Sequence, residues 1–444
     1  MTGRRLALAL LIALAFVHPS EAAAPARPAK NTRHATHRAV KPPAMVWHVE
    51  SIDGTVLDSR DADAPINPAS VMKVATSWWA LEKLGPDYRF TTSFYARGTL
   101  EPEKGQLRGD LVVKSNGDPD FQAENAFLVA QSLNKMGIKR ITGSVVVDAS
   151  FWMGWENGSE GRNPDEDARA ETMAARLRSV LDVRRWTRHT RSAWIDYVAR
   201  TGTPRNPVPS VQVIGGIKYE REPATTTLLF EHRSKALADT LRRFNCFSNN
   251  DIERVGMSIG SPSDLAVMLA DRLVAANAPV LVDTTSGLGE NRLSPRQIVA
   301  MLRGFRATAS GIGLPVEQLL PVSGCDPGTV TGAFPRLASP PYAKALVAKT
   351  GTLTSTDGGI TVLAGFLNTA QGEVVFCVAV PHAAGRIHQA RRTEESFVLD
   401  LIAQHGGAMP RTCGPPLLAP DEQATIITAA SASSHGSGNV TSAR

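Results

Sequence analysis

A serine and a lysine three residues apart are the first side chains in this chain that could do chemistry together. Ser70 and Lys73 lie in the run Asn-Pro-Ala-Ser-Val-Met-Lys, residues 67–73. Apolar residues recur at helical spacing after Ser70 and Gly85 follows them, which predicts a helix that begins at Ser70 and ends at Gly85. On one face of such a helix, a neutral Lys73 could take the hydroxyl proton and make Ser70 a nucleophile. The alternative is that Ser70 only caps the helix and that Lys73 is solvated.

Two later stretches add further hydroxyl, carboxamide and amine groups. The tripeptide Ser-Asn-Asn at 248–250 follows a predicted helical segment, and Lys-Thr-Gly-Thr at 349–352 ends a strand that begins near residue 345. The glycine at 351 would permit a ligand backbone to approach that strand closely. A Ser-x-Asn pattern alone is common, since residues 132–134 repeat it. The ordered set Ser-x-x-Lys, Ser-x-Asn and Lys-Thr-Gly is much more specific than any one of its members.

The composition limits the class of protein that must position these residues. The chain has 444 residues, of which 43% are hydrophobic and 20% are charged, and this predicts a soluble globular protein with two or more domains. The formal net charge of +6 suits contact with an anionic surface such as a cell envelope and does not indicate nucleic acid as a partner.

The termini predict export and two disordered segments. Arg4 and Arg5 precede a short apolar run and small residues follow it, so residues 1–24 are predicted to be a signal peptide, with a retained membrane anchor as the alternative. Residues 25–44 are predicted to be a disordered basic leader. The Pro-, Ala- and Ser-rich residues 409–444 are predicted to be a disordered tail.

Export would make disulfides available to the four cysteines of the chain. They are Cys246, Cys325, Cys377 and Cys413, which allow three pairings. The sequence does not choose among these pairings, and free buried thiols are the alternative.

Much of the stretch between the first two motifs is predicted to be an inserted domain. β-like segments with a helix over residues 127–136 predict a domain over 91–234, so that the catalytic domain comprises 45–90 plus 235–408. Within the insert, residues 176–191 are strongly basic and several tryptophans surround them. This pattern predicts either a basic helix that touches an anionic polymer or a solvated helix face above buried tryptophans.

The ordered motif set is typical of penicillin-binding proteins and class A β-lactamases. Beyond these motifs, the sequence resembles the D-alanyl-D-alanine carboxypeptidase/endopeptidase family of class C low-molecular-mass penicillin-binding proteins, peptidase family S13. The residues that carry the resemblance are 67–73, 89–92, 109–111, 117–119, 248–250, 286–288, 320–324 and 348–353.

The resemblance implies a mixed α/β (α+β) fold, in which a penicillin-binding or β-lactamase-like transpeptidase domain has an antiparallel sheet flanked by helices and carries an inserted β-rich domain. The chain departs from the family in two places. The stretch from Ser70 to Ser248 is shorter than usual and residues 151–230 match poorly, so the insert is partly degenerate. The residues at 251–254, Asp-Ile-Glu-Arg, replace a more apolar pattern.

The resemblance also implies roles for individual residues. Ser70 would attack the carbonyl of the penultimate D-alanine, with Lys73 as general base. Ser248 would relay a proton to the departing amine, and Asn250 would bond the peptide amide. Lys349, Thr350 and Thr352 would hold the terminal carboxylate, while Gly351 and Ser286 would line the substrate site. The backbone N–H groups of Ser70 and Thr352 would form the oxyanion hole. No cofactor or metal is implied.

The function implied is a periplasmic serine-type D-Ala-D-Ala carboxypeptidase. It would act on peptidoglycan stem peptides and be acylated by β-lactams, without nucleic acid and with at most peripheral contact with the membrane. The choice between carboxypeptidase and endopeptidase action, and the oligomeric state, stay open. One alternative is an envelope protein of the same fold that binds peptidoglycan with little or no catalysis. A β-lactamase is a second alternative, for which the sequence indicates no dedicated deacylation base.

Overall fold

The computed structural model describes residues 45–154, 165–273 and 278–428 of the chain. The predicted signal peptide, the predicted basic leader and residues 429–444 of the predicted tail lie outside these ranges. Within them, no helix combines the length and the apolar character that a membrane span requires.

A five-stranded antiparallel sheet combines two strands from residues 46–60 with three strands from residues 346–381, in the order β10-β11-β12-β1-β2. The turn between β1 and β2 contains Gly54, which has a positive φ of 94°, and the Asp53 carboxylate accepts the N–H of Thr55 there. The strands are β1 (Val46–Ser51), β2 (Val56–Arg60), β10 (Leu346–Leu353), β11 (Ile360–Thr369) and β12 (Gly372–Pro381).

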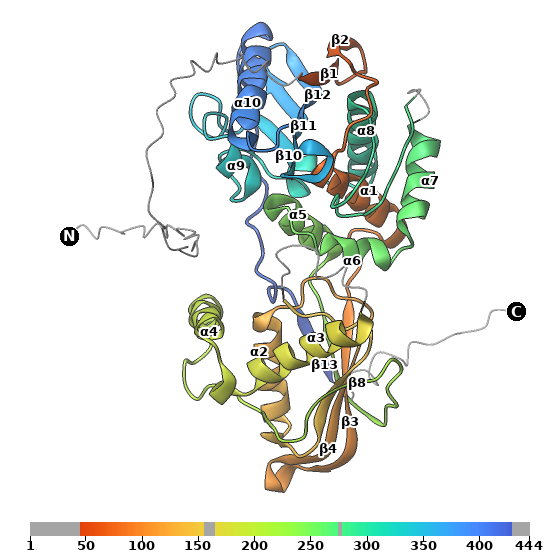
Figure 1. Ribbon diagram of the computed structural model, residues 1–444. Helices are drawn as coiled ribbons and strands as arrows, with labels where there is room; N and C mark the ends of the chain where they lie inside the picture. The colour runs from red at the N-terminus through yellow and green to blue at the C-terminus, as the bar shows by residue number, and fades with distance from the viewer. Residues whose placement is uncertain (1–44, 155–164, 274–277, 429–444) are drawn as a thin grey trace, which may run out of the picture. The chain divides into compact units, whose positions relative to one another are not determined.

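Helices cover both faces of this sheet (Figure 1). Alternate residues of β10 to β12 pack into two different cores, as the pleat of a strand requires. One core contains α1 (Met72–Leu84) and α8 (Pro295–Gly311), and the other contains α10 (Ile387–Gln404). The remaining helices of this region are α5 (Leu237–Phe247), α6 (Ile252–Met257), α7 (Pro262–Arg272) and α9 (Thr329–Ala333).

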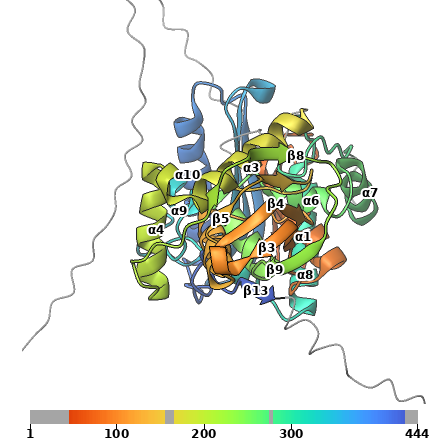
Figure 2. The ribbon, with the colours of Figure 1, turned by 90° about the horizontal axis from the view of Figure 1, so that it is seen from below.

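A second, mixed sheet of eight strands is built mainly from residues 91–233. Its strands are β3 (Thr91–Glu101), β4 (Gln106–Ser115), β5 (Arg140–Ile141), β6 (Ser144–Val147), β7 (Gln212–Val213), β8 (Gly216–Tyr219), β9 (Thr227–Arg233) and β13 (Thr425–Thr428). Helices α2 (Ala123–Lys135), α3 (Glu166–Leu181) and α4 (Arg188–Thr201) pack against it in a common core. Figure 2 shows β13 beside β9 at one edge of this sheet.

The prediction of a disordered tail from residue 409 is wrong for residues 409–428. Strand β13 pairs with β9, and the Asp421 carboxylate forms an ion pair with Arg200 of α4. Cys413 is bonded to Cys325, which also decides the disulfide question, since Cys246 and Cys377 are buried free thiols. The β-branched run Thr-Ile-Ile-Thr at 425–428 favours a strand, although the surrounding composition obscures it.

The prediction of one basic helix over residues 176–191 is also wrong. Helix α3 ends at Leu181, a 3₁₀ turn spans Val183–Arg185, and α4 begins at Arg188. Trp186 and Trp194 are buried in the core of the insert. The alternative of buried tryptophans is therefore confirmed for these two residues.

Candidate active site

Ser70 lies in a tight turn that leads into α1. The turn is the 3₁₀ helix η1 (Ala69–Val71), and the cap position of α1 is Val71, whose side chain makes no cap hydrogen bond. Ser70 therefore does not cap the helix, and that alternative is wrong. The predicted end of the helix at Gly85 is confirmed, since the N–H of Gly85 bonds the carbonyl of Leu81.

Asn67 holds the turn in front of Ser70. Its Oδ1 accepts the N–H of Ala69 at 3.0 Å, and Ala69 has a φ of +48°, which is uncommon for a residue other than glycine. The Nδ2 of Asn67 donates to the carbonyl of Gly289 and to the carboxylate of Asp357, both at 2.8 Å. Side-chain bonds from distant segments thus fix the backbone that presents the serine.

Lys73 is fully buried, and its Nζ lies within hydrogen-bond distance of three oxygen atoms. Its Nζ lies 3.0 Å from Ser70 Oγ, 2.8 Å from Asn250 Oδ1 and 2.5 Å from the carbonyl oxygen of Ser286. Burial lowers the pKa of Lys73 to about 7, and the negative charges of Glu253 and Asp251 oppose this shift. An amine of this pKa, within reach of a hydroxyl, can act as a base near neutral pH.

A second buried lysine contacts the second motif serine. Lys349 Nζ donates to Ser248 Oγ at 2.9 Å and to the carbonyl of Thr350 at 2.9 Å. Burial, followed by repulsion from Lys73, places the pKa of Lys349 well below its usual value. Ser248 itself terminates α5 in the left-handed conformation, with a φ of 55°. The structure thus links Ser70, Lys73 and Asn250 in one set of bonds and links Ser248 with Lys349 in another.

Two glycines allow other segments to approach the Ser70 turn. A Cβ atom at Gly351 would lie 2.6 Å from the carbonyl oxygen of Pro68, and one at Gly287, whose φ is +86°, would collide with the carbonyl of Ala69. The glycine of Lys-Thr-Gly was expected to make room for a ligand. In this structure it makes room for the turn that carries Ser70.

The two threonines of the Lys-Thr-Gly-Thr segment lie at the end of β10, which confirms the prediction that this segment ends a strand. Thr350 Oγ1 donates to Thr329 Oγ1 at 2.8 Å, and Thr352 Oγ1 accepts a bond from Arg391 of α10 at 3.1 Å. Sequence reasoning missed Arg391. The only signal was an arginine near the start of the helix that packs on the motif-bearing sheet.

Ser286 meets Lys73 through its backbone carbonyl. The residue is 1% exposed, and its hydroxyl accepts the N–H of Leu288. We therefore assign Ser286 to holding Lys73 rather than to direct contact with substrate.

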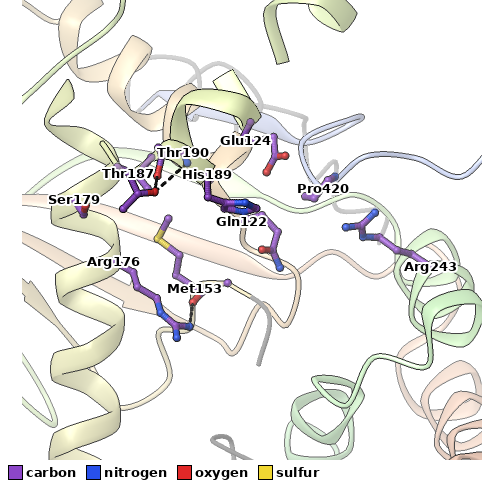
Figure 3. Close-up of a pocket in the computed structure, with 14 residues that line it drawn as sticks. Gln122, Glu124, Met153, Arg176, Ser179, Thr187, His189, Thr190, Arg243 and Pro420 are labelled. Carbon is purple, nitrogen blue, oxygen red and sulfur yellow. Dashed lines mark hydrogen bonds between the residues drawn. The ribbon is translucent and has the colours of Figure 1, made fainter. Parts of the chain in front are cut away.

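A separate cavity of about 590 Å³ lies away from these motifs (Figure 3). Its walls come from α2, α3 and α4, with Arg243 of α5 and Pro420. None of the motif residues lines it. Among the described residues, no group of three or more His, Cys, Asp or Glu side chains is placed to hold a metal ion.

The sequence matches the model of the D-Ala-D-Ala carboxypeptidase 3 (S13) family over residues 41–175 and 208–398. The unmatched residues between these ranges fall within the stretch that was predicted to depart from the family. The D-alanyl-D-alanine carboxypeptidase DacB of Haemophilus influenzae is 23% identical over an alignment of length 386, and the match covers 69% of this chain and 78% of DacB. That of Actinomadura sp. strain R39 is 32% identical over 104 residues, 23% of this chain and 19% of the relative.

Solved structures share the fold. Bd3459, a predatory peptidoglycan endopeptidase from Bdellovibrio bacteriovorus, superposes with a TM-score of 0.70 at 21% identity, covering 86% of this chain and 98% of its own. Penicillin-binding protein 4 (dacB) of Haemophilus influenzae gives 0.59 at 19% identity, covering 82% and 97%. A structure of Bd3459 acylated by penicillin G is also similar, with a TM-score of 0.69 at 20% identity over 86% of this chain and 99% of that one.

These matches confirm the predicted family and the predicted fold class of a transpeptidase domain with an insert. The family acts on D-Ala-D-Ala peptides, and its motif residues form two sets of bonds, one around Lys73 and one around Lys349. The chain belongs to the S13 family and is a serine-type D-Ala-D-Ala carboxypeptidase.

Proposed function

We propose that Ser70 is the nucleophile of this peptidase and that Lys73 is its general base. The observation that carries the proposal is the 3.0 Å bond between Lys73 Nζ and Ser70 Oγ, made by a buried amine whose pKa is about 7. A lysine with the usual pKa would be charged at neutral pH and could not accept the serine proton.

In the proposed reaction, Ser70 Oγ attacks the carbonyl of the penultimate D-alanine while its proton passes to Lys73. Collapse of the tetrahedral intermediate breaks the peptide bond, leaves an ester on Ser70 and releases D-alanine. Ser248 relays a proton to the departing amine, and its bond with Lys349 supports this role. Water then hydrolyses the ester and restores Ser70. Asn250, which is bonded to Lys73, would also bind the peptide amide of the substrate.

The terminal carboxylate of the substrate would lie along β10, which forms an edge of the five-stranded sheet. Lys349, Thr350 and Thr352 are proposed to bind it, and Arg391 joins them because it already donates to Thr352. An arriving carboxylate would favour the charged form of Lys349. The backbone N–H groups of Ser70 and Thr352 are proposed as the oxyanion hole, a feature typically worth about 3–4 kcal/mol at the barrier.

Membership of a family of cell-wall peptidases places the protein outside the cytoplasm. We propose more specifically a periplasmic protein, exported by residues 1–24, that cleaves peptidoglycan stem peptides ending in D-Ala-D-Ala and is acylated by β-lactams. No nucleic acid takes part. The inactive peptidoglycan-binding alternative is disfavoured because all five proposed catalytic side chains occur together in two sets of hydrogen bonds.

Fluorescent penicillin tests the nucleophile directly. Purified wild-type protein is expected to take up about one label per chain, and Ser70→Ala none, because the ester cannot form without the hydroxyl. An unlabelled wild-type protein would contradict the enzymatic proposal. Sustained hydrolysis of nitrocefin would instead favour a β-lactamase.

Purified muropeptides then distinguish the two peptidase activities. Free D-alanine released from pentapeptides indicates a carboxypeptidase, whereas conversion of cross-linked dimers into monomers indicates an endopeptidase.

A further inference from the structure

The segment after Asn250, where the sequence departs from the family, places a carboxylate behind the proposed base. Glu253 lies in α6, and its two carboxylate oxygens accept two successive backbone N–H groups. Oε1 accepts from Thr285 at 3.1 Å and Oε2 accepts from Ser286 at 2.7 Å. Ser286 is the residue whose carbonyl accepts a bond from Lys73 at 2.5 Å.

The segment held by Glu253 also contacts the nucleophile helix and the nucleophile turn. The carbonyl of Thr285 accepts a bond from Thr76 of α1 at 2.6 Å. Gly287, the next residue but one, packs so closely on the carbonyl of Ala69 that a Cβ atom would not fit. Residues 285–287 therefore contact both α1 and the turn that carries Ser70. Glu253 binds the N–H groups of the first two of these residues.

We propose that Glu253 is a positioning residue for the general base. Its carboxylate holds residues 285–287 so that the Ser286 carbonyl orients the Lys73 amine toward Ser70, and its negative charge acts on that amine. The proposal rests on the function proposed for Ser70 and Lys73.

A carboxylate suits this position because it offers two acceptors to two N–H groups. A glutamine would offer one acceptor and would turn an NH₂ group toward the other N–H, which leaves a buried donor without an acceptor. The charged groups that face Lys73 are Glu253 and Asp251, which raise its pKa, and Lys349 of β10. Losing either acid should therefore lower the pKa of Lys73.

Three variants separate the holding of the segment from the charge. Glu253→Asp keeps the charge but shortens the side chain, so it should lose the hold on residues 285–287. Asp251→Asn is the matched control, because it removes a neighbouring charge and leaves both bonds of Glu253 in place. Glu253→Gln should show both effects.

The measurement is the second-order rate constant for acylation by penicillin G, taken between about pH 5 and 9, with circular dichroism to check folding. For Glu253→Asp we expect the rate constant at its high-pH plateau to fall about tenfold or more, while the pH at which the rate constant is half its plateau stays unchanged. For Asp251→Asn we expect an unchanged plateau and a midpoint lowered by about half a pH unit or more. If Glu253→Gln does not fold, these two variants still decide the matter.

Folded Glu253 variants with the wild-type plateau and midpoint would overturn the inference. So would a fall in plateau for Asp251→Asn that equals that of Glu253→Asp. These outcomes are distinct from a failure of the proposed function, in which wild-type protein itself takes up no penicillin.

Discussion

Lys73 and Lys349 are both buried, and each amine contacts a hydroxyl group. Among the described residues, no carboxylate forms a hydrogen bond with either amine. Burial disfavours the charge on each, and the charge on one lysine disfavours the charge on the other. Packing rather than a partner base therefore lowers the pKa of both amines. At the scale of single residues, this supports the proposed role of Lys73 as the base that activates Ser70.

Acylation by penicillin G should depend on pH through Lys73. Below its pKa the amine is protonated and cannot accept the Ser70 proton, so the rate should rise with pH and reach half its plateau near pH 7. Stopped-flow or quenched labelling over the pH range measures this midpoint. A midpoint near the ordinary lysine value of about 10.4 would contradict Lys73 as a neutral base.

Arg391→Ala should lower kcat/KM for substrates that end in a free carboxylate. A lost charge-assisted bond of about 1.5–3 kcal/mol corresponds to a roughly 10- to 150-fold fall in kcat/KM. The same substrate with an amidated C-terminus should be affected little. Arg392→Ala is the matched control, because Arg392 is exposed on the same helix. Equal losses for the free and the amidated substrate would mean that Arg391 does not contact the carboxylate.

The motif residues could be predicted from sequence because their types and order are specific, whereas their supports could not. These supports contact segments that lie far away along the chain, and local sequence spacing does not predict such contacts; they are Asn67, Glu253 and Arg391. Ser286 was expected to touch substrate. Its carbonyl, which any residue possesses, contacts Lys73 instead.

At the scale of elements, local pattern predicted α1 and α2, because each has a clear helical period. The strand β13 was missed because four residues inside a Pro- and Ala-rich segment carry too weak a pattern, and its partner β9 lies almost 200 residues earlier. Elements that depend on such partners are decided by tertiary contacts.

The disulfide between Cys325 and Cys413 anchors the segment that leads to β13, across a sequence separation of 88 residues. Replacing both cysteines by serine should lower the free energy of unfolding by about 2–4 kcal/mol, since the unfolded chain regains the freedom of the opened loop. Urea denaturation measures the difference. Dithiothreitol should lower the free energy of unfolding of the wild type to that of the variant and leave the variant unchanged. A decrease in both proteins would mean that the disulfide is not the cause.

At the scale of the whole molecule, both sheets pair strands that lie far apart along the chain. The first sheet pairs β1 with β12, and the second pairs β9 with β13. The sequence predicted one catalytic domain from residues 45–90 and 235–408 but no particular strand pairing, and it did not predict β13 at all.

Ending the chain after Ala424 should expose the edge of β9 that β13 now covers. Unpaired edges promote association between chains, so we expect a lower melting temperature and more light scattering on heating. A chain that ends after Thr428 retains β13 and is the matched control. Identical melting of the two truncated chains would show that β13 adds nothing to stability.

The strand order also determines when folding can finish during synthesis. β1 is synthesised early, yet its neighbour β12 is complete only at Pro381. Likewise, β9 can pair with β13 only after Thr428 has been synthesised. Pairings between such distant segments form slowly, because a long loop must close first. If residues 1–24 direct export as proposed, this delay would favour translocation, because neither sheet can be completed before most of the described chain has been made.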